Sequence, residues 1–578
     1  MNLYNYFQIF TFTILSKFLT MNIKPSYNNL NKIFNQLFGG CNATVKRQLK
    51  DICSELNHYN NTSINPSQYQ LDYSLSKKQS KFIPMPPPNI TGKLHMGHAL
   101  FLTIQDSLNR FYSSTGHSVL WLSGLDHAGL ATHDKIIEYM INHNCNDYHM
   151  SSSYIEQIHS DIILKQIYQM GATPFGWNED KQPYIYTLNK TYQTFILEVL
   201  QCLKEDGLLH YNNDNFYLNM DELANELLAD IGCNLEEESE AIIKITPKQE
   251  IGKLKHFLMN IEQWNISRNI DWGTPFPYDS NLNLIDNDNP NKQSLDTWFN
   301  SSLYPIASLL TMWHENINNV QNQYLSFQDI LDKFYPAELI ETGADILFFW
   351  CARMLMMGHY VYKNQHRIAL LKNYKIQFKY PFYKIYLHGL IRDKQNRKFS
   401  KSLGNGIDPL ELIQQYESQY PIKDALRWTL ITKTGPAEDM KFSHNDANLF
   451  AAFKLMNKIW NAGKFFYHYC QQNNVHYQNP IDNKHLFNSI QRINAIIHNF
   501  VYQMNNYQFL IAAKQLEHEF KSWFCDNWIE LNKSEIQNGN NIILQEGLYI
   551  YLQFIIMFSC FCPFITKYIL NDLYDNYS

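Results

Sequence analysis

The sequence predicts an α/β fold with a parallel sheet, followed by an all-helical region. Residues 81–133 are patterned as strand, helix and strand, which is the order of a βαβ unit with parallel strands. From residue 445 to the end, apolar residues recur at the 3.6-residue period of α-helices. The chain has 578 residues, of which 45% are hydrophobic and 18% charged. This length suggests roughly three or four domains, and the composition excludes global disorder.

The βαβ unit begins with the strand "KFIPMPPPN" (81–89), which its prolines end, because they can continue neither a helix nor the centre of a sheet. A helix ending near Gly116 follows, with apolar residues at helical spacing: Leu94, Leu100, Ile104, Leu108 and Phe111. "HSVLWLSGLD" (117–126) has the pattern of a buried strand that ends in a glycine turn. These three elements account for the predicted parallel sheet.

The remaining segments are less regular. We expect a helix from Thr187 to Leu209 and an acidic, irregular stretch over 211–264, with "LEEESE" (235–240) as a solvated face. Strand-like and helical patches alternate from 293 to 410. Residues 22–80 are polar and Asn-rich, and Met21 is an alternative start of translation. The predicted divisions are an N-terminal extension (1–80), two halves of one α/β domain (81–210 and 266–444) around a connective insertion (211–265), and a helical domain (445–578).

Composition excludes some classes of protein. The net charge of −6 neither supports nor excludes nucleic acid, because binding needs a local basic face. The ten cysteines form no CxxC pair, so we expect reduced thiols and no protein metal site. No run of about 20 apolar residues predicts a membrane span. The apolar first 20 residues lack the basic start and cleavage site of a secretory signal.

"PPPNITGKLHMGHAL" (86–100) places His95 and His98 at the start of the predicted helix. The free N–H groups and the dipole of a helix N-terminus suit phosphate. Residues three apart share a helix face, and Gly97 between them lets a ligand approach the backbone. Two imidazoles there would stabilise a transferring phosphoryl group. The alternative is an ordinary pair of histidines in a first helical turn, and this motif alone does not decide between them.

A second motif, "KFSKSLGNGIDP" (398–409), places Lys398 and Lys401 in a Gly- and Asn-rich stretch. Lysine is a mobile point charge, so a flexible loop carrying both could close over a triphosphate. Taken alone, the motif is better interpreted as a solvated basic loop.

Together, an early HxGH and a late KxSKS are the paired signature of class I aminoacyl-tRNA synthetases, and the sequence around them resembles the valyl-tRNA synthetase family. Five further segments match that family in order: "WLSGLDHAGLAT" (121–132), "WNISRNIDWGTPFP" (264–277), "LDTWFNSSLYP" (295–305), "ETGADILFFWCARMLMMG" (341–358) and "HGLIRD" (388–393). "NKIWNAGKFF" (457–466), "FCDNWIELNK" (524–533) and "PFITKYI" (563–569) resemble its helical anticodon-binding domain. The resemblance covers about residues 81–570 and implies a Rossmann-type catalytic domain split by a connective insertion.

The resemblance implies that valine attacks Mg²⁺-bound ATP to give valyl-adenylate, which is then transferred to the 3′ end of tRNA(Val). The substrate carboxylate is the nucleophile, so no protein nucleophile is needed. The implied catalytic residues are His95, His98, Lys398 and Lys401. The implied ATP-binding residues are these four together with Gly97, Gly343, Asp345, Gly389 and Ser400. We also expect a monomer that is located in the cytoplasm and has no membrane partner. As its source we expect a bacterium with a reduced genome, such as an endosymbiont, more than an organelle.

For valine, the resemblance assigns Asp126 to the ammonium group. Pro87 and Asn89 lie beside it by analogy, and the apolar box consists of Trp298, Ile346 and Trp350. The last two are four apart, so a helix would place them on one face, although core packing is the alternative. For tRNA, the resemblance implies contacts by Lys454, Lys458 and Lys464, with Trp460 available for stacking. The alternative is that these lysines lie on an ordinary solvated helix surface.

The sequence departs from the family mainly by what it lacks. About 55 residues separate Leu209 from Ile266, too few for the family's editing domain, and we also expect the C-terminal coiled coil to be missing. Phe399 replaces the usual Met, and Leu125 and His133 also depart from the pattern. Two alternatives stay open. One is a degenerate paralogue that no longer charges tRNA, and the other is a class I nucleotidylyltransferase, which shares the HxGH clamp but not the helical tail.

Overall fold

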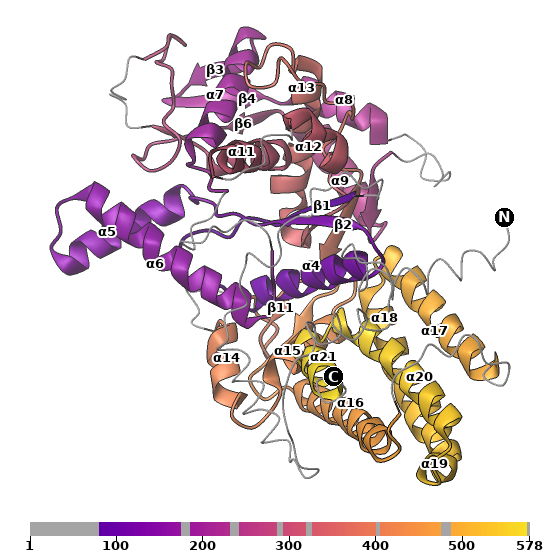
Figure 1. The fold of residues 1–578 in the computed structure, drawn as a ribbon. Helices are drawn as coiled ribbons and strands as arrows, with labels where there is room; N and C mark the ends of the chain where they lie inside the picture. Colours follow the sequence, from indigo (N-terminus) through magenta and orange to yellow (C-terminus); the bar gives the residue numbers. More distant parts are fainter. Residues whose placement is uncertain are drawn as a thin grey trace.

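The computed structural model describes residues 80–174, 185–231, 242–285, 293–319, 326–399, 405–475 and 487–574. An α/β body carries a protruding helical hairpin of α5 (Leu130–His143) and α6 (Tyr148–Gln169), and a helical bundle lies below it (Figure 1). The predicted α/β class with a helical C-terminal region is confirmed.

The predicted βαβ unit is also confirmed. It consists of β1 (Ser80–Pro84), α4 (Met96–Ser114) and β2 (Ser118–Leu122). The two strands are parallel and pair in register over all five residues, with Phe82 opposite Leu120. The helix begins at Met96 because His95 is its N-cap, with an extended backbone (φ −111°, ψ 177°).

A second parallel sheet has the order β5 (Lys244–Thr246), β10 (Lys384–His388), β9 (Ile340–Gly343). The backbone N–H of Glu338, just before β9, donates to the carbonyl of Phe82 at 2.8 Å. This hydrogen bond brings the two parallel sheets alongside each other, so the strands that precede both sequence motifs belong to one body (Figure 1).

The prediction of an irregular stretch over 211–264 is wrong. It contains one whole strand of an antiparallel sheet, β4 (Asn215–Asn219), and parts of its two partners, β3 (Leu209–Asn212) and β6 (Gln263–Asn265), together with α8 (Asp221–Ile231) and α9 (Glu250–Asn260). Strands of three to five residues are too short to show a clear period of two. β5 also lies within this predicted connective insertion, yet it pairs with β10 of the second parallel sheet. The acidic "LEEESE" segment lies outside the described residues.

The helix predicted from Thr187 to Leu209 is present as α7 (Lys190–Glu205), and Leu209 begins β3 instead. Asn213 and Asp214 adopt left-handed conformations (φ 47° and 59°), which close the tight β3–β4 hairpin. The other elements of the α/β body are β7 (Ser267–Arg268), β8 (Ser294–Leu295), α10 (Thr297–Ser302), α11 (Tyr304–Asn319), α12 (Phe327–Phe334), the 3₁₀ turn η2 (Ala344–Ile346), the π-helical η3 (Leu347–Ala352), α13 (Arg353–Asn364), β11 (Ile391–Arg392), α14 (Pro409–Tyr416), α15 (Ile422–Lys433) and β12 (Met440–Lys441).

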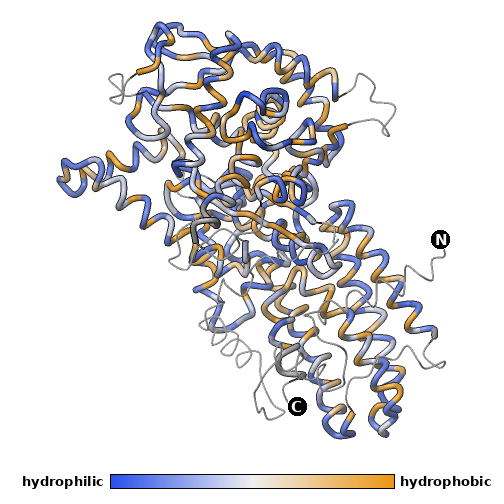
Figure 2. The backbone as a smooth tube through the Cα atoms, turned by 45° about the horizontal axis from the view of Figure 1, so that its top comes forward, coloured by the Kyte–Doolittle hydropathy of each residue, from blue (hydrophilic) through white to orange (hydrophobic). Residues whose placement is uncertain are grey.

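The helical prediction for the last part of the chain is confirmed. Its helices are α16 (Ala447–Gln472), α17 (Phe487–Asn505), α18 (Phe509–His518), the π-helical η6 (Glu519–Ile529), α19 (Glu530–Gln537), α20 (Asn541–Ser559) and α21 (Pro563–Tyr574). Hydrophobic and hydrophilic residues alternate along them (Figure 2). By length and composition α20 could cross a membrane, but 72% of its most apolar window is buried, as expected of the core helix of a bundle.

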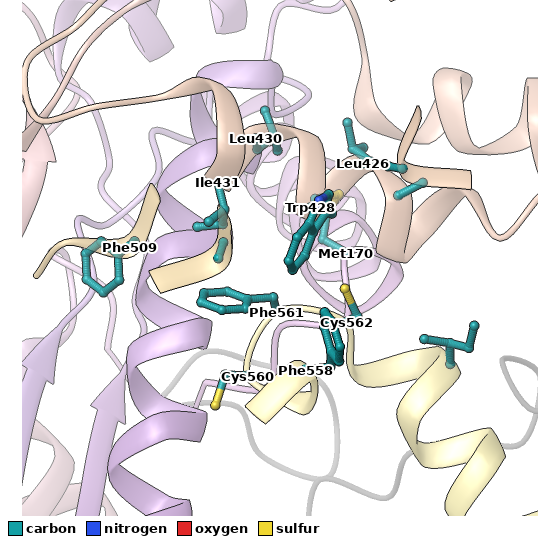
Figure 3. Packing of buried hydrophobic residues seen from close by; sticks show 14 of the residues in the cluster. Met170, Leu426, Trp428, Leu430, Ile431, Phe509, Phe558, Cys560, Phe561 and Cys562 are labelled. Carbon is teal, nitrogen blue, oxygen red and sulfur yellow. The ribbon is translucent and has the colours of Figure 1, made fainter. Parts of the chain in front are cut away.

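Arg427 on α15 joins the bundle to the α/β body. Its guanidinium is fully buried and donates to Asp106 Oδ2 on α4 (2.6 Å) and to the carbonyls of Phe561 (2.8 Å) and Met170 (3.1 Å). The neighbouring Trp428 points toward Phe558 and Phe561 (Figure 3). Since removing one partner of a buried ion pair costs about 3–5 kcal/mol, this contact holds α4 firmly against the bundle.

Candidate active site

The histidine pair lies at the N-terminus of α4. The N–H of Gly97 donates to His95 Nδ1 (3.0 Å), and the N–H of His95 donates to His98 Nδ1 (3.1 Å). Because each Nδ1 accepts, each neutral ring carries its proton on Nε2. The ring centroids are 4.0 Å apart, which confirms that the two side chains share one face. A Cβ on residue 97 would lie 2.8 Å from His95 Cε1, so Gly97 is needed to seat this ring.

Lys398 of the second motif meets the "TGAD" segment. Its Nζ lies 2.7 Å from Asp345 Oδ2, and both side chains are substantially exposed. Asp345 follows the end of β9, where a Cβ on Gly343 would lie 2.7 Å from Asp345 Oδ1. The structure thus brings together three of the predicted ATP-binding residues. Ser400 and Lys401 lie outside the described residues.

Gln166 connects the two motifs. Its side chain accepts from Leu94 N–H (2.7 Å) and donates to the Leu94 carbonyl (3.0 Å) and to Asp408 Oδ1 (3.0 Å). Asp408 ends the second motif and caps α14, and its other oxygen lies 3.1 Å from Lys93 Nζ. The end of the second motif is therefore fastened next to the histidines. Neither residue was predicted from the sequence: Gln166 belongs to no motif, and the role of Lys93, inside the first motif, depends on the distant Asp408.

A buried polar chain lies beneath the ends of β9 and β10. His388 Nδ1 is 2.5 Å from Glu341 Oε1, and Gln105 of α4 donates to Glu341 Oε2 at 2.9 Å. A Cβ on the next residue, Gly389, would lie 2.0 Å from the carbonyl oxygen of Glu438. The close approach at Gly389 is therefore to the chain's own backbone, whereas the resemblance assigned this glycine to ATP.

Asp126 is 4% exposed, and its backbone pairs with that of Asn89 in a parallel bridge. Its Oδ1 accepts from Thr297 Oγ1 (2.5 Å) and from the N–H of Ala128 (2.7 Å), and Ser301 supplies a further hydrogen bond. Burial nevertheless raises the pKa of Asp126 to about 6. Among the described residues, no lysine or arginine pairs with it. The site is thus an anion held by neutral donors, which suits a ligand cation.

The neighbouring His127 does not supply that cation. Burial lowers the pKa of its imidazole to about 3, so the ring is neutral near pH 7. Its Nδ1 lies 2.7 Å from Thr187 Oγ1, and the buried Nε2 has no hydrogen-bond partner among the residues that the structure describes.

The segment predicted to carry two residues of the apolar box is not a regular α-helix. Ile346 ends the 3₁₀ turn η2 and Trp350 lies in the π-helical η3, so the four-residue α-helical repeat expected to place them on one face is not kept. Trp350 is 2% exposed and donates Nε1–H to the carbonyl of Ser301 (3.0 Å). Since Ser301 also bonds Asp126, α10 links the indole to the carboxylate. Ile346, Trp298 and Pro87 are half-buried, and Asn89 is exposed.

The predicted tRNA contacts lie on α16. Lys454 is exposed, Lys464 is half-buried and Lys458 forms a 2.6 Å ion pair with Asp526. The prediction that Trp460 is available for stacking on tRNA is wrong. Trp460 is 5% exposed, and its ring centroid lies 5.2 Å from that of Tyr568. A sequence signal was present, because Trp460 continues the apolar stripe of Leu449, Phe453 and Met456 at helical spacing.

Comparisons with known proteins agree with this architecture. A family model described as "tRNA synthetases class I (I, L, M and V)" matches residues 63–238, 211–285 and 284–443. A second model, "Anticodon-binding domain of tRNA ligase", matches residues 489–578. Curated relatives include the valine–tRNA ligase of Mycoplasmopsis synoviae (strain 53), 24% identical over 704 residues covering 88% of this chain and 79% of the relative. That of Thermotoga maritima is 32% identical over 347 residues, covering 56% of this chain and 36% of the relative.

Solved structures show the same fold. A leucyl-tRNA synthetase of Agrobacterium radiobacter K84, in a ternary complex with tRNA and LeuAMS, has a TM-score of 0.62 at 14% identity, covering 92% of this chain and 89% of that one. The methionyl-tRNA synthetase of Mycobacterium tuberculosis with methionyl-adenylate has a TM-score of 0.59 at 14% identity, covering 84% and 92%. With matches that together run from residue 63 to residue 443, well over half of its length, the chain belongs to the class I tRNA synthetases of the I, L, M and V group.

Proposed function

We propose that this class I synthetase is an ATP-dependent valine–tRNA ligase, acting as a monomer in the cytoplasm. The observation that carries the choice of substrate is the buried carboxylate of Asp126, held by neutral donors and linked through α10 to the indole of Trp350. An anion beside an apolar wall suits a small apolar amino acid, whose ammonium would be the missing cation. The valine–tRNA ligases among the relatives support valine within that class.

In the proposed reaction, His95, His98 and the N–H groups at the start of α4 bind the phosphates of ATP. Lys398 and Lys401 stabilise the negative charge that develops on them. Asp345, beside Gly343, accepts hydrogen bonds from the ribose hydroxyls. Mg²⁺ arrives with the ATP phosphates, as it does in many nucleotide sites. Among the described residues, no group of three His, Cys, Asp or Glu side chains could hold a metal ion.

Asp126 fixes the ammonium so that the valine carboxylate faces the α-phosphate. An oxygen of that carboxylate attacks phosphorus, pyrophosphate leaves, and valyl-adenylate remains. A hydroxyl of the terminal adenosine of tRNA then attacks the acyl carbon, and AMP leaves. Each step needs mainly positioning and charge stabilisation, which the described side chains can supply.

We further propose that the enzyme does not edit. The alignment with the Mycoplasmopsis relative has 704 positions and is longer than this 578-residue chain, so the relative carries segments inside it without a counterpart here. Between β4 and β6 the described elements are only α8, β5 and α9. An apolar pocket rejects an isosteric hydroxyl analogue weakly, with a known factor of about 10² for valine enzymes acting on threonine. Hydrolysis of pre-charged threonyl-tRNA(Val) well above its spontaneous rate would contradict this proposal.

Amino-acid-dependent ATP–pyrophosphate exchange tests the substrate. We expect exchange with valine and loss of about 10²-fold or more in His98→Ala, because one donor to the developing charge is removed. His143→Ala, at an exposed histidine, is the matched control, and its exchange rate should be unchanged.

Stronger exchange with leucine, isoleucine or methionine than with valine would refute valine as the substrate. No exchange by well-folded protein would favour the degenerate paralogue, whereas the match to an anticodon-binding domain argues against a nucleotidylyltransferase.

A further inference from the structure

Three parts of the proposed valine site depend on the short helix α10. Thr297 donates to Asp126 Oδ1 at 2.5 Å. The carbonyl of Ser301 accepts from Trp350 Nε1–H at 3.0 Å. Between these two helix residues, Trp298 is a wall of the predicted apolar box. A displacement of α10 would therefore change the ammonium anchor and the shape of the box together.

Other elements must hold α10 in place, because its six residues are far too few for a helix that is stable by itself. Asp296, the residue before it, is its N-cap and is 4% exposed. The backbone N–H of Asp296 donates to the carbonyl of Ile266 at 2.8 Å. Asp296 is therefore the point at which α10 is joined to the segment that follows β6.

The carboxylate of Asp296 is held by Trp264 and Arg268 of that segment, and we call these three residues the Asp296 clamp. Its Oδ2 accepts from Trp264 Nε1–H at 3.1 Å, and its Oδ1 lies 3.1 Å from Arg268 Nη2. Trp264, on β6, pairs with Leu218 of β4. Arg268, on β7, pairs with Ser294 of β8, two residues before Asp296. The clamp thus ties α10 to the antiparallel sheet of the predicted connective insertion.

The surroundings of the clamp call for a negative charge at Asp296. The guanidinium of Arg353 lies 3.9 Å from the ring centroid of Trp264, and this arginine is 9% exposed. Burial lowers the pKa of Arg353 to about 10, and the charge of Asp296 counteracts this effect. Burial also raises the pKa of Asp296, which the charge of Arg268 counteracts. A buried charge without its partner is strongly destabilising, so loss of this carboxylate would displace the segments that carry the two arginines.

A buried ion pair can serve the fold alone, but the place of this one relates it to the amino acid. The peptide after Asp296 leads directly to Thr297, the donor to Asp126, and then to Trp298. Because α10 is so short, few residues are available to absorb a displacement at its start. A change at Asp296 should therefore reach the ammonium anchor and the box.

We propose that Asp296 is a positioning residue for amino-acid selection. Held by the other two members of the clamp, it fixes α10 so that Thr297 meets Asp126 and Trp298 closes the box to side chains larger than that of valine. This inference rests on the proposed function, since it names what keeps the valine site in shape. It gives the connective sheet of β3, β4 and β6 a part in amino-acid activation.

Asp296→Asn tests the inference, because asparagine keeps the size and can still accept from the indole N–H but carries no charge. In ATP–pyrophosphate exchange we expect KM for valine to rise about tenfold or more and KM for ATP to stay within about twofold. The preference for valine over isoleucine in kcat/KM should fall about fivefold or more, since the fit of the box discriminates the extra methylene group. The pH midpoint for valine should rise, because a weaker hydrogen bond from Thr297 favours the ionised form of Asp126 less.

Changes at Arg268 test whether the charge pair carries the effect. Arg268→Lys keeps the charge and should leave KM for valine within a few fold, whereas Arg268→Gln should raise it. In the double variant of Asp296→Asn and Arg268→Gln the losses should be less than multiplicative, because the second change removes a charge that the first left unpaired. Asp206→Asn is the matched control, since it takes a carboxylate from a tyrosine hydroxyl and from Arg367 at the end of α7, and its exchange should be unchanged.

Trp264→Phe keeps the inference testable if Asp296→Asn does not fold. It removes the indole N–H but keeps a ring, and KM for valine should rise about threefold or more. Unchanged KM for valine and unchanged preference over isoleucine in folded variants would overturn the inference. Equal rises of KM for valine and for ATP would also overturn it, because the clamp would then support the whole α/β body.

Absence of valine exchange in wild type would instead refute the proposed function. Calorimetric titration of valine, isoleucine, leucine and methionine into wild type and Asp296→Asn would then decide on the clamp separately. Weaker binding of the preferred amino acid by the variant would support the clamp, and equal affinities or no binding to either protein would overturn it.

Discussion

The two ends of the candidate active site are held in different ways. The histidine pair is oriented within four residues, by N–H groups of its own helix turn, and His95 is exposed. The carboxylate of Asp126 is buried and oriented by α10, which begins 171 residues later with Thr297. Phosphate binding therefore depends on a local helix terminus, whereas amino-acid binding depends on contacts between distant segments. Changes at the second end should affect valine without affecting ATP.

Asp126→Asn should have the largest effect. It removes the charge but keeps a similar shape, so the ammonium of valine would be left without its anion in a buried site. We expect kcat/KM for valine in ATP–pyrophosphate exchange to fall about 10²-fold or more, with KM for ATP nearly unchanged. Equal losses for both substrates would show that the two ends are not independent.

Thr297→Val should come next. The isosteric change removes a hydrogen bond to a carboxylate, worth about 1.5–3 kcal/mol, so KM for valine should rise about tenfold or more. Thr297→Ser keeps the hydroxyl and should restore KM to within a few fold. If serine fails to rescue, the hydroxyl alone does not set KM, and the methyl group of Thr297 is needed to position it.

The pH dependence of valine use should differ from that of a protein with an ordinary aspartate. The pKa of Asp126 is raised to about 6 by burial, and only the ionised form attracts an ammonium. Below pH 6, kcat/KM for valine should therefore fall about tenfold per pH unit, as for any essential group that must be ionised. In Thr297→Val the midpoint should move to higher pH, because a hydrogen bond that favours the carboxylate is lost. Exchange rates measured from pH 5 to 8 at saturating ATP test this, and a flat profile would contradict it.

The smallest effect that we predict is on stability: Lys398→Ala should barely change the free energy of unfolding. Its ion pair with Asp345 joins two exposed side chains, and such pairs contribute less than about 1 kcal/mol. The midpoint of thermal unfolding should barely change, while KM for ATP rises. A large loss of stability would mean that the loop supports the fold as well as binding phosphate.

Much of the fold could be predicted because the signals were local. The proline run, the apolar spacing of α4 and the 3.6-residue period after residue 445 each report on neighbours within a few turns. The short strands β3, β4 and β6 were missed, because pairing over three to five residues is decided by partners far along the chain. Trp460 was misassigned for the opposite reason: its stripe was visible, but the resemblance suggested a tRNA contact.

The sequence by itself determined the α/β and helical regions, the two paired motifs and the family, since all of these depend on residue order. Tertiary structure alone decided which groups surround Asp126 and how Gln166 fastens one motif to the other. The physical reason is that hydrogen bonds at those places join segments up to 242 residues apart, such as Gln166 and Asp408. Such contacts leave no periodic trace in either partner's sequence.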